Sequence, residues 1–112
     1  MKLKLGIVGH GFVGSAVDYA FTTEGVKKFI VDPKIDTSID DLIEWKPDIT
    51  FVCAPTPMSD DGNIDAAIVI DATLKLISHT DSLVVIKSTI TPDVINQIYN
   101  SIHAENAQRI TY

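Results

Sequence analysis

The sequence predicts an α/β fold in which a doubly wound parallel sheet carries helices on both faces. Five short apolar runs alternate with segments of helical spacing, and the runs are apolar on successive residues. Strand–helix alternation builds parallel sheets, and strands that are apolar on both sides belong to sheets covered on both faces. Because such crossovers are right-handed, we expect the strand order 3-2-1-4-5, with strands 1 and 4 adjacent at a crevice.

The strands follow one another at regular intervals. The first is expected at Leu3–Val8, and apolar residues at helical spacing follow it up to a stop at Gly25. The remaining strands are expected at residues 27–31, 49–53, 83–87 and 109–112. A chain of 112 residues with this pattern fits one domain, residues 1–112.

Three further helices are marked by their starts. Thr37 or Ser38 can cap a short second helix, and Asp65 can cap a third that runs to about Ser78. The fourth helix has a hydroxyl at Thr91, then a proline at the first helical position and an acid near the positive end of the helix dipole.

Composition excludes several function classes. Nine basic and fifteen acidic residues give a net charge of −6, which repels nucleic-acid phosphates and anionic membranes. No apolar run approaches the roughly 20 residues of a membrane span, and the N-terminus does not resemble a signal peptide. Cys53 is the single cysteine and the three histidines lack metal-like spacing, so we expect no disulfide, no metal site and a reducing, cytoplasmic setting.

A glycine motif, Gly9-His10-Gly11-Phe12-Val13-Gly14, ends the first strand and opens the first helix. Gly9 permits a tight turn, Gly11 lets a pyrophosphate approach the backbone, and Gly14 lets the helix pack close to the sheet. The N–H groups of the helix start can then receive the phosphates, so the motif predicts a dinucleotide-binding fold of the Rossmann type.

Asp32 indicates which dinucleotide is bound. It ends the second strand, eighteen residues after Gly14, where a carboxylate can accept hydrogen bonds from the adenosine ribose. The same charge repels the extra phosphate of NADP, so we expect NAD. Lys34 leaves an alternative open, because a cation there would tolerate that phosphate unless it is simply a solvated lysine.

The fourth strand ends in Lys-Ser-Thr. In the expected order, Ser88 and Thr89 lie beside the glycine turn, where their hydroxyls can bind the nicotinamide end of the cofactor, although turn and capping chemistry also explains Ser88. Cys53 lies in an apolar strand without a histidine to activate it, so we expect a small core residue. The side chain of His10 is expected near the phosphates or in solvent.

The glycine motif, Asp32, the stretch VCAPTPMSDDGNID and KSTITP together resemble the NAD-binding domain of the UDP-glucose/GDP-mannose dehydrogenase family over essentially the whole chain. The resemblance implies that Val13, Asp32, Thr56 and Thr89 contact NAD, with Thr89 also near the reacting carbon. The prolines on either side of Thr56 would hold that residue toward the dinucleotide. The expected cofactor-binding residues are therefore Gly9, Gly11, Phe12, Val13, Gly14, Asp32, Lys34, Thr56 and Thr89.

The resemblance also implies a reaction, two hydride transfers that oxidise a sugar primary alcohol of a nucleotide sugar to a carboxylate, in polysaccharide biosynthesis. In the family a catalytic cysteine, a lysine, the sugar-nucleotide site and the homodimer depend on regions beyond this domain, and Cys53 does not match that cysteine's motif. We therefore expect cofactor binding without turnover. Pro92 is followed by Asp93-Val94 where the family has Gly-Thr, a departure within the last motif.

Two alternatives remain for the function. One is a stand-alone domain that senses a dinucleotide and regulates a partner. The other is a different NAD dehydrogenase with a small substrate, against which the proline-rich loop argues.

Overall fold

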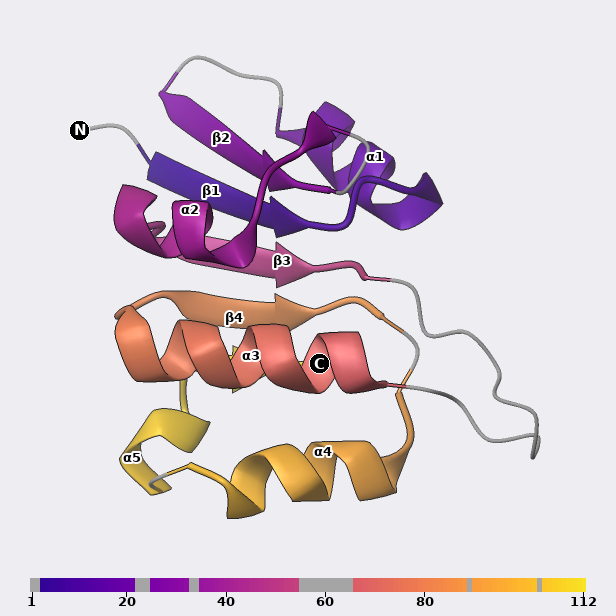
Figure 1. The fold of residues 1–112 in the computed structure, drawn as a ribbon, viewed down its shortest axis with the longest axis vertical. Helices are drawn as coiled ribbons and strands as arrows, with labels where there is room; N and C mark the ends of the chain where they lie inside the picture. Colours follow the sequence, from indigo (N-terminus) through magenta and orange to yellow (C-terminus); the bar gives the residue numbers. More distant parts are fainter. Residues whose placement is uncertain (1–2, 22–24, 33–34, 55–65, 89, 103) are drawn as a thin grey trace.

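The computed structural model describes residues 3–21, 25–32, 35–54, 66–88, 90–102 and 104–112, and these build one five-stranded sheet of order β2-β1-β3-β4-β5 (Figure 1). All paired strands are parallel. The strands are β1 (Leu3–Val8), β2 (Val26–Val31), β3 (Ile49–Val52), β4 (Leu83–Ile86) and β5 (Ile110–Thr111). The helices are α1 (Phe12–Ala20), α2 (Ile39–Trp45), α3 (Ala67–His79), α4 (Pro92–Asn100) and α5 (Ala104–Ala107).

The predicted alternation is confirmed, with small differences at the ends of elements. Helix α1 stops at Ala20, before the predicted stop at Gly25, and the short α5 was not expected. Ser38 caps α2 in a reciprocal capping box with Asp41. The N-cap of α3 is Ala66 rather than Asp65, which lies outside the described residues.

The predicted strand order 3-2-1-4-5 is wrong, because β3 pairs with β1 and not with β2. The right-handed crossover rule leaves open which edge of the sheet receives the returning strand. Gly6 provides a physical reason for the observed choice. A β-carbon at Gly6 would lie 2.8 Å from Leu42 Cδ1, so the missing side chain makes the hollow in which fully buried Leu42 of α2 sits. Helix α2 therefore lies over β1, and β3 joins β1 on its free edge.

The helices cover the two faces unequally. Thr50 of β3 lies on the face of Gly6 and α2, whereas the alternate residue Phe51 packs against Phe21 at the end of α1, with ring centroids 5.6 Å apart. Helix α1 thus covers one face, and α2, α3 and α4 share the other. Figure 1 shows α2 and α3 in front of the sheet.

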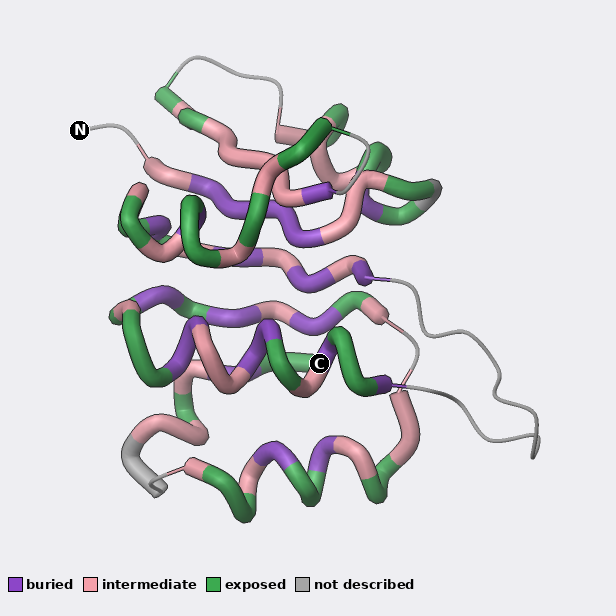
Figure 2. The backbone as a smooth tube through the Cα atoms, in the orientation of Figure 1, coloured by how far each residue is buried: buried purple, intermediate pink, exposed green. Residues whose placement is uncertain are grey.

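The main core lies between the sheet and the three helices α2, α3 and α4. Figure 2 shows buried positions along the middle strands and at intervals along α3. The members of this core are Val8, Leu42, Val52, Ala54, Val69, Ala72, Leu76, Ile77, Val84, Ile86, Ile95, Ile98 and Ile110. No helix among the described residues is both long and apolar enough to cross a membrane.

Candidate dinucleotide-binding site

The turn after β1 is held tightly against the end of β3. Gly9 has a φ of +92°, a conformation that favours glycine, and its N–H donates to Val31 O at 2.7 Å. A β-carbon on Gly9 would lie 2.8 Å from Cys53 O and 3.0 Å from Ala54 Cα. Gly9 therefore lets the turn pass between the ends of β2 and β3, where a side chain would clash.

The other two glycines of the motif have opposite surroundings. A β-carbon on Gly14 would overlap the carbonyl oxygen of Gly9, so Gly14 allows α1 to pack directly on the turn. A β-carbon on Gly11 would meet no heavy atom of the described residues within 4 Å. Packing thus explains the glycines at 9 and 14 but not the one at 11. Open space beside a bare backbone suits an approaching ligand.

The start of α1 borders this open space with backbone N–H groups that the helix itself does not pair. Gly11 is the N-cap residue and provides no side-chain cap, and its carbonyl accepts the N–H of Ser15 at 2.9 Å. The first N–H groups of a helix have no partner within the helix, and the helix dipole is positive there. Val13 is 43% exposed in this first turn, and the side chain of Phe12 lies outside the described part. The residues present fit the phosphates of a dinucleotide.

Asp32 lies against the same turn. It is 8% exposed, and its Oδ2 accepts the backbone N–H of His10 at 2.7 Å. Thr37 fixes its backbone, since the hydroxyl donates to Ile30 O at 2.7 Å and accepts the N–H of Asp32 at 3.0 Å. The carboxylate is thereby held against His10, the residue between Gly9 and Gly11.

The end of β3 separates Ser88, the described one of the two residues predicted beside the turn, from β1. Because β3 lies between β1 and β4, Cys53 and Ala54 occupy the position expected for Ser88 and Thr89. The hydroxyl of Ser88 donates to Ala54 O at 2.7 Å, so it ties the β4 loop to the end of β3. Ser88 thus links two strand ends, which is neither the cofactor contact nor the turn or capping interaction considered from the sequence. Thr89, like Lys34 and Thr56, lies outside the described residues.

Cys53 behaves as a packing residue. It is half-buried, and its β-carbon lies 3.6 Å from the β-carbon position of Gly14. Burial raises the pKa of the Cys53 thiol to about 11, and nearby Lys87 offsets only part of that effect. A thiol that stays protonated at neutral pH is a poor nucleophile. The described residues also contain no group of three His, Cys, Asp or Glu side chains that would hold a metal.

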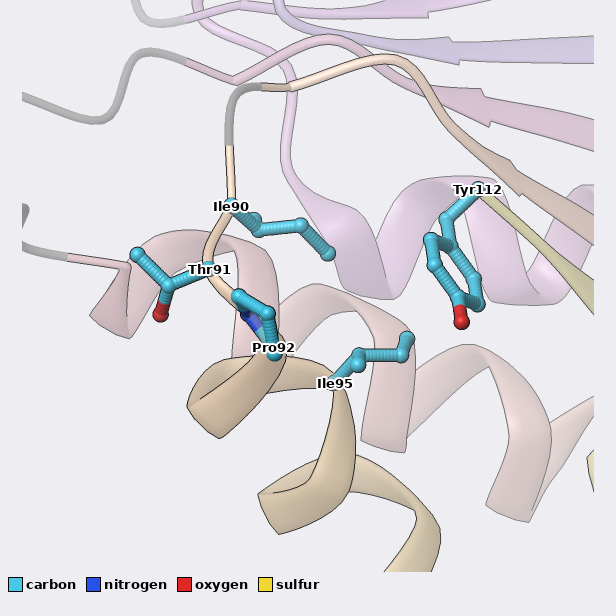
Figure 3. A pocket seen from close by; sticks show the side chains of 5 residues that line it. All are labelled: Ile90, Thr91, Pro92, Ile95 and Tyr112. Atoms are coloured by element: carbon cyan, nitrogen blue, oxygen red, sulfur yellow. The ribbon is translucent and has the colours of Figure 1, made fainter.

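A small cavity of about 140 Å³ lies at the start of α4 (Figure 3). Its lining is mostly apolar and consists of Ile90, Thr91, Pro92, Ile95 and Tyr112. Thr91 occupies the predicted N-cap position of α4, but its side chain makes no capping hydrogen bond. The cavity has neither the size nor the donors for a dinucleotide, so the glycine turn remains the candidate site.

One set of contacts at the turn was not predicted. His10 was expected near the phosphates or in solvent, yet its Nε2 lies 3.0 Å from Asp18 Oδ2. Lys28 Nζ lies 2.5 Å from Asp18 Oδ1. The only signal in the sequence is that charges interrupt two mostly apolar segments, Asp18 in the first and Lys27-Lys28 in the second.

Comparison with known proteins assigns the chain to a family. The chain shares its fold with a UDP-glucose dehydrogenase from the hyperthermophilic archaeon Pyrobaculum islandicum, at a TM-score of 0.65 and 22% sequence identity. The match covers 99% of this chain and 34% of that one, so the chain spans about a third of its length. No curated protein matches significantly. Residues 34–111 match the NAD binding domain of the UDP-glucose/GDP-mannose dehydrogenase family, and the chain belongs to that family.

Proposed function

We propose that this chain holds NAD, through the turn after β1 and the carboxylate of Asp32, for a dehydrogenase that oxidises a nucleotide sugar. The observation that carries the proposal is the contrast among the three glycines. Gly9 and Gly14 are confined by neighbouring backbone, whereas Gly11 faces open space. This geometry supports an approach of the pyrophosphate to Gly11 and to the first N–H groups of α1.

The adenosine ribose would lie beside Asp32. The Asp32 carboxylate is already oriented by the N–H of His10, so this side chain needs little further ordering when the ribose hydroxyls bind. The negative charge disfavours a 2′-phosphate at the same place, which supports a preference for NAD over NADP. Val13, on the exposed first turn of α1, would cover the pyrophosphate side of the cofactor.

The proposed overall reaction takes a sugar primary alcohol to a carboxylate in two oxidation steps. NAD, when bound, accepts the hydride. This chain's residues bind and orient the cofactor, and Thr89 is proposed to support its nicotinamide end. The aldehyde stage needs a nucleophile, for which the protonated Cys53 thiol is unsuited. We propose that the nucleophile and the sugar-nucleotide site come from protein outside these 112 residues.

Calorimetric titration tests the proposal directly. Wild-type protein should bind NAD⁺ and NADH at one site and bind NADP⁺ at least about tenfold more weakly, a difference of about 1.4 kcal/mol. Equal or tighter binding of NADP⁺ would contradict the role of Asp32 and favour Lys34 as a phosphate ligand. A folded protein that binds neither cofactor would rule out the proposed site.

A further inference from the structure

Three charged or titratable side chains from three elements meet beside the glycine turn. His10 comes from the turn, Asp18 from α1 and Lys28 from β2. Asp18 lies between the other two, with Oδ2 at 3.0 Å from His10 Nε2 and Oδ1 at 2.5 Å from Lys28 Nζ. Lys28 Nζ also donates to Asp18 O at 3.1 Å. The three side chains are a quarter to a third exposed, so their contacts are partly shielded from solvent.

The carboxylate of Asp18 is well suited to hold the imidazole. The hydrogen bond from Lys28, and then that from His10, lower the pKa of Asp18 below its ordinary value, so it is ionised at neutral pH. An ionised carboxylate is an acceptor only, so the His10 ring donates through Nε2–H. Hydrogen bonds with a charged partner are the stronger ones.

His10 is thereby anchored at three points. Its ring is bound to Asp18, its backbone N–H donates to Asp32 Oδ2 at 2.7 Å, and its carbonyl accepts the hydroxyl of Ser15 at 3.3 Å. Gly11 is the next residue, so the position of His10 decides where the open backbone lies. The backbone N–H of His10 also orients the carboxylate of Asp32 toward the turn.

We infer that Asp18 is a positioning residue of the NAD site, acting through the imidazole of His10. Lys28 orients the carboxylate of Asp18, the carboxylate holds the ring, and the ring holds the backbone that meets the pyrophosphate and binds Asp32. This inference rests on the proposed function, since it assigns a task to residues that lie behind the cofactor. Neither Asp18 nor Lys28 would touch NAD.

The test compares paired variants by calorimetric titration with NADH, after thermal melting has shown that each is folded. His10→Leu removes the ring donor and leaves the pair of Asp18 and Lys28 intact. His10→Gln keeps an N–H donor at a similar distance from the backbone. We expect His10→Leu to bind NADH about tenfold more weakly, the effect of one lost charge-assisted hydrogen bond, and His10→Gln to recover most of that loss.

Asp18→Asn should weaken NADH binding in the same direction, and Asp71→Asn is its matched control. Asp71 makes an exposed ion pair with Lys75 at 3.6 Å on α3, away from the turn, so the control should bind like the wild type. The ring-nitrogen NMR signals of His10 should shift in Asp18→Asn and stay unchanged in Asp71→Asn.

Two results would overturn the inference. One is wild-type affinity in folded His10→Leu, and the other is equal weakening in His10→Leu and His10→Gln, which would show that the donor is irrelevant. If the wild type binds no NADH, the proposed function fails separately. The ring-nitrogen signals would then still report whether Asp18 holds the imidazole.

Discussion

Adding a methyl group at Gly11 or at Gly14 should affect the stability of the protein differently, because the two glycines have opposite surroundings. In Gly14→Ala the new β-carbon overlaps the backbone oxygen of Gly9, which cannot rotate away, so α1 must move off the sheet. Overpacking costs about 1–3 kcal/mol, and an overlap with fixed backbone belongs in the upper half of that range, at about 2–3 kcal/mol. Alanine returns up to about 1 kcal/mol of helix propensity, which leaves a net loss of roughly 1–2 kcal/mol.

The loss can be measured as a change in melting temperature. At about 4 °C per kcal/mol for a chain of this size, Gly14→Ala should melt roughly 4–8 °C below the wild type. The methyl group of Gly11→Ala meets no atom of the described residues, so this variant should lose less than about 1 kcal/mol, mainly from its poorer N-cap. Its β-carbon would nevertheless occupy the space assigned to the pyrophosphate.

Circular dichroism melts and calorimetric titration with NADH distinguish the two effects. Both variants should bind NADH at least about tenfold more weakly, a loss of 1.4 kcal/mol or more, but only Gly14→Ala should lose appreciable stability. Unchanged NADH affinity in Gly11→Ala would show that the open space is not the pyrophosphate site. An unchanged melting temperature in Gly14→Ala would show that α1 does not pack on Gly9 as described.

Asp32→Ala should weaken NADH binding by about 1–3 kcal/mol in calorimetry, because it removes a charged hydrogen-bonding partner, and equal affinity would exclude the ribose contact. Cys53, with a pKa of about 11, should react with a thiol reagent at pH 8 on the order of 100-fold more slowly than an ordinary thiol, and fast labelling of folded protein would contradict its burial. Wild type and Cys53→Ser should both form no NADH from UDP-glucose or GDP-mannose at saturating NAD⁺; turnover that Cys53→Ser abolishes would identify a nucleophile.

The sequence predicts the elements of this fold well, apart from the four-residue α5, because the others have local signals. The apolar runs, Ser38 before α2 and Pro92 at the start of α4 all mark boundaries that the structure confirms. Strand order has no such signal, since it depends on which edge of β1 receives β3. The informative residue is Gly6, because Leu42 packs where a side chain at position 6 would lie. A glycine within a strand does not reveal from the sequence alone which residue packs against it.

The same error explains which of the expected contacts between residues the structure contains. Gly9, Gly11, Gly14 and Asp32 depend only on β1, β2 and the turn between β1 and α1, so the wrong strand order does not affect their positions. Ser88 depends on the position of β4, so the wrong order placed it at the turn. The contact between His10 and Asp18 joins side chains eight residues apart, and spacing alone does not reveal it.

The hydrogen bonds of Thr37 also affect how the protein can associate, because β2 is an edge strand of the sheet. Val31 O bonds toward β1, and alternate carbonyls point to opposite edges, so Ile30 O points outward. The Thr37 hydroxyl donates to Ile30 O and accepts the next outward-pointing N–H, that of Asp32. It therefore occupies the two backbone groups that a neighbouring strand would otherwise pair with. A strand from another molecule would have to displace Thr37 to pair there, and farther along β2 it would meet the exposed Lys27. One threonine and one lysine thus protect an open edge against the strand-to-strand association that leads to aggregation.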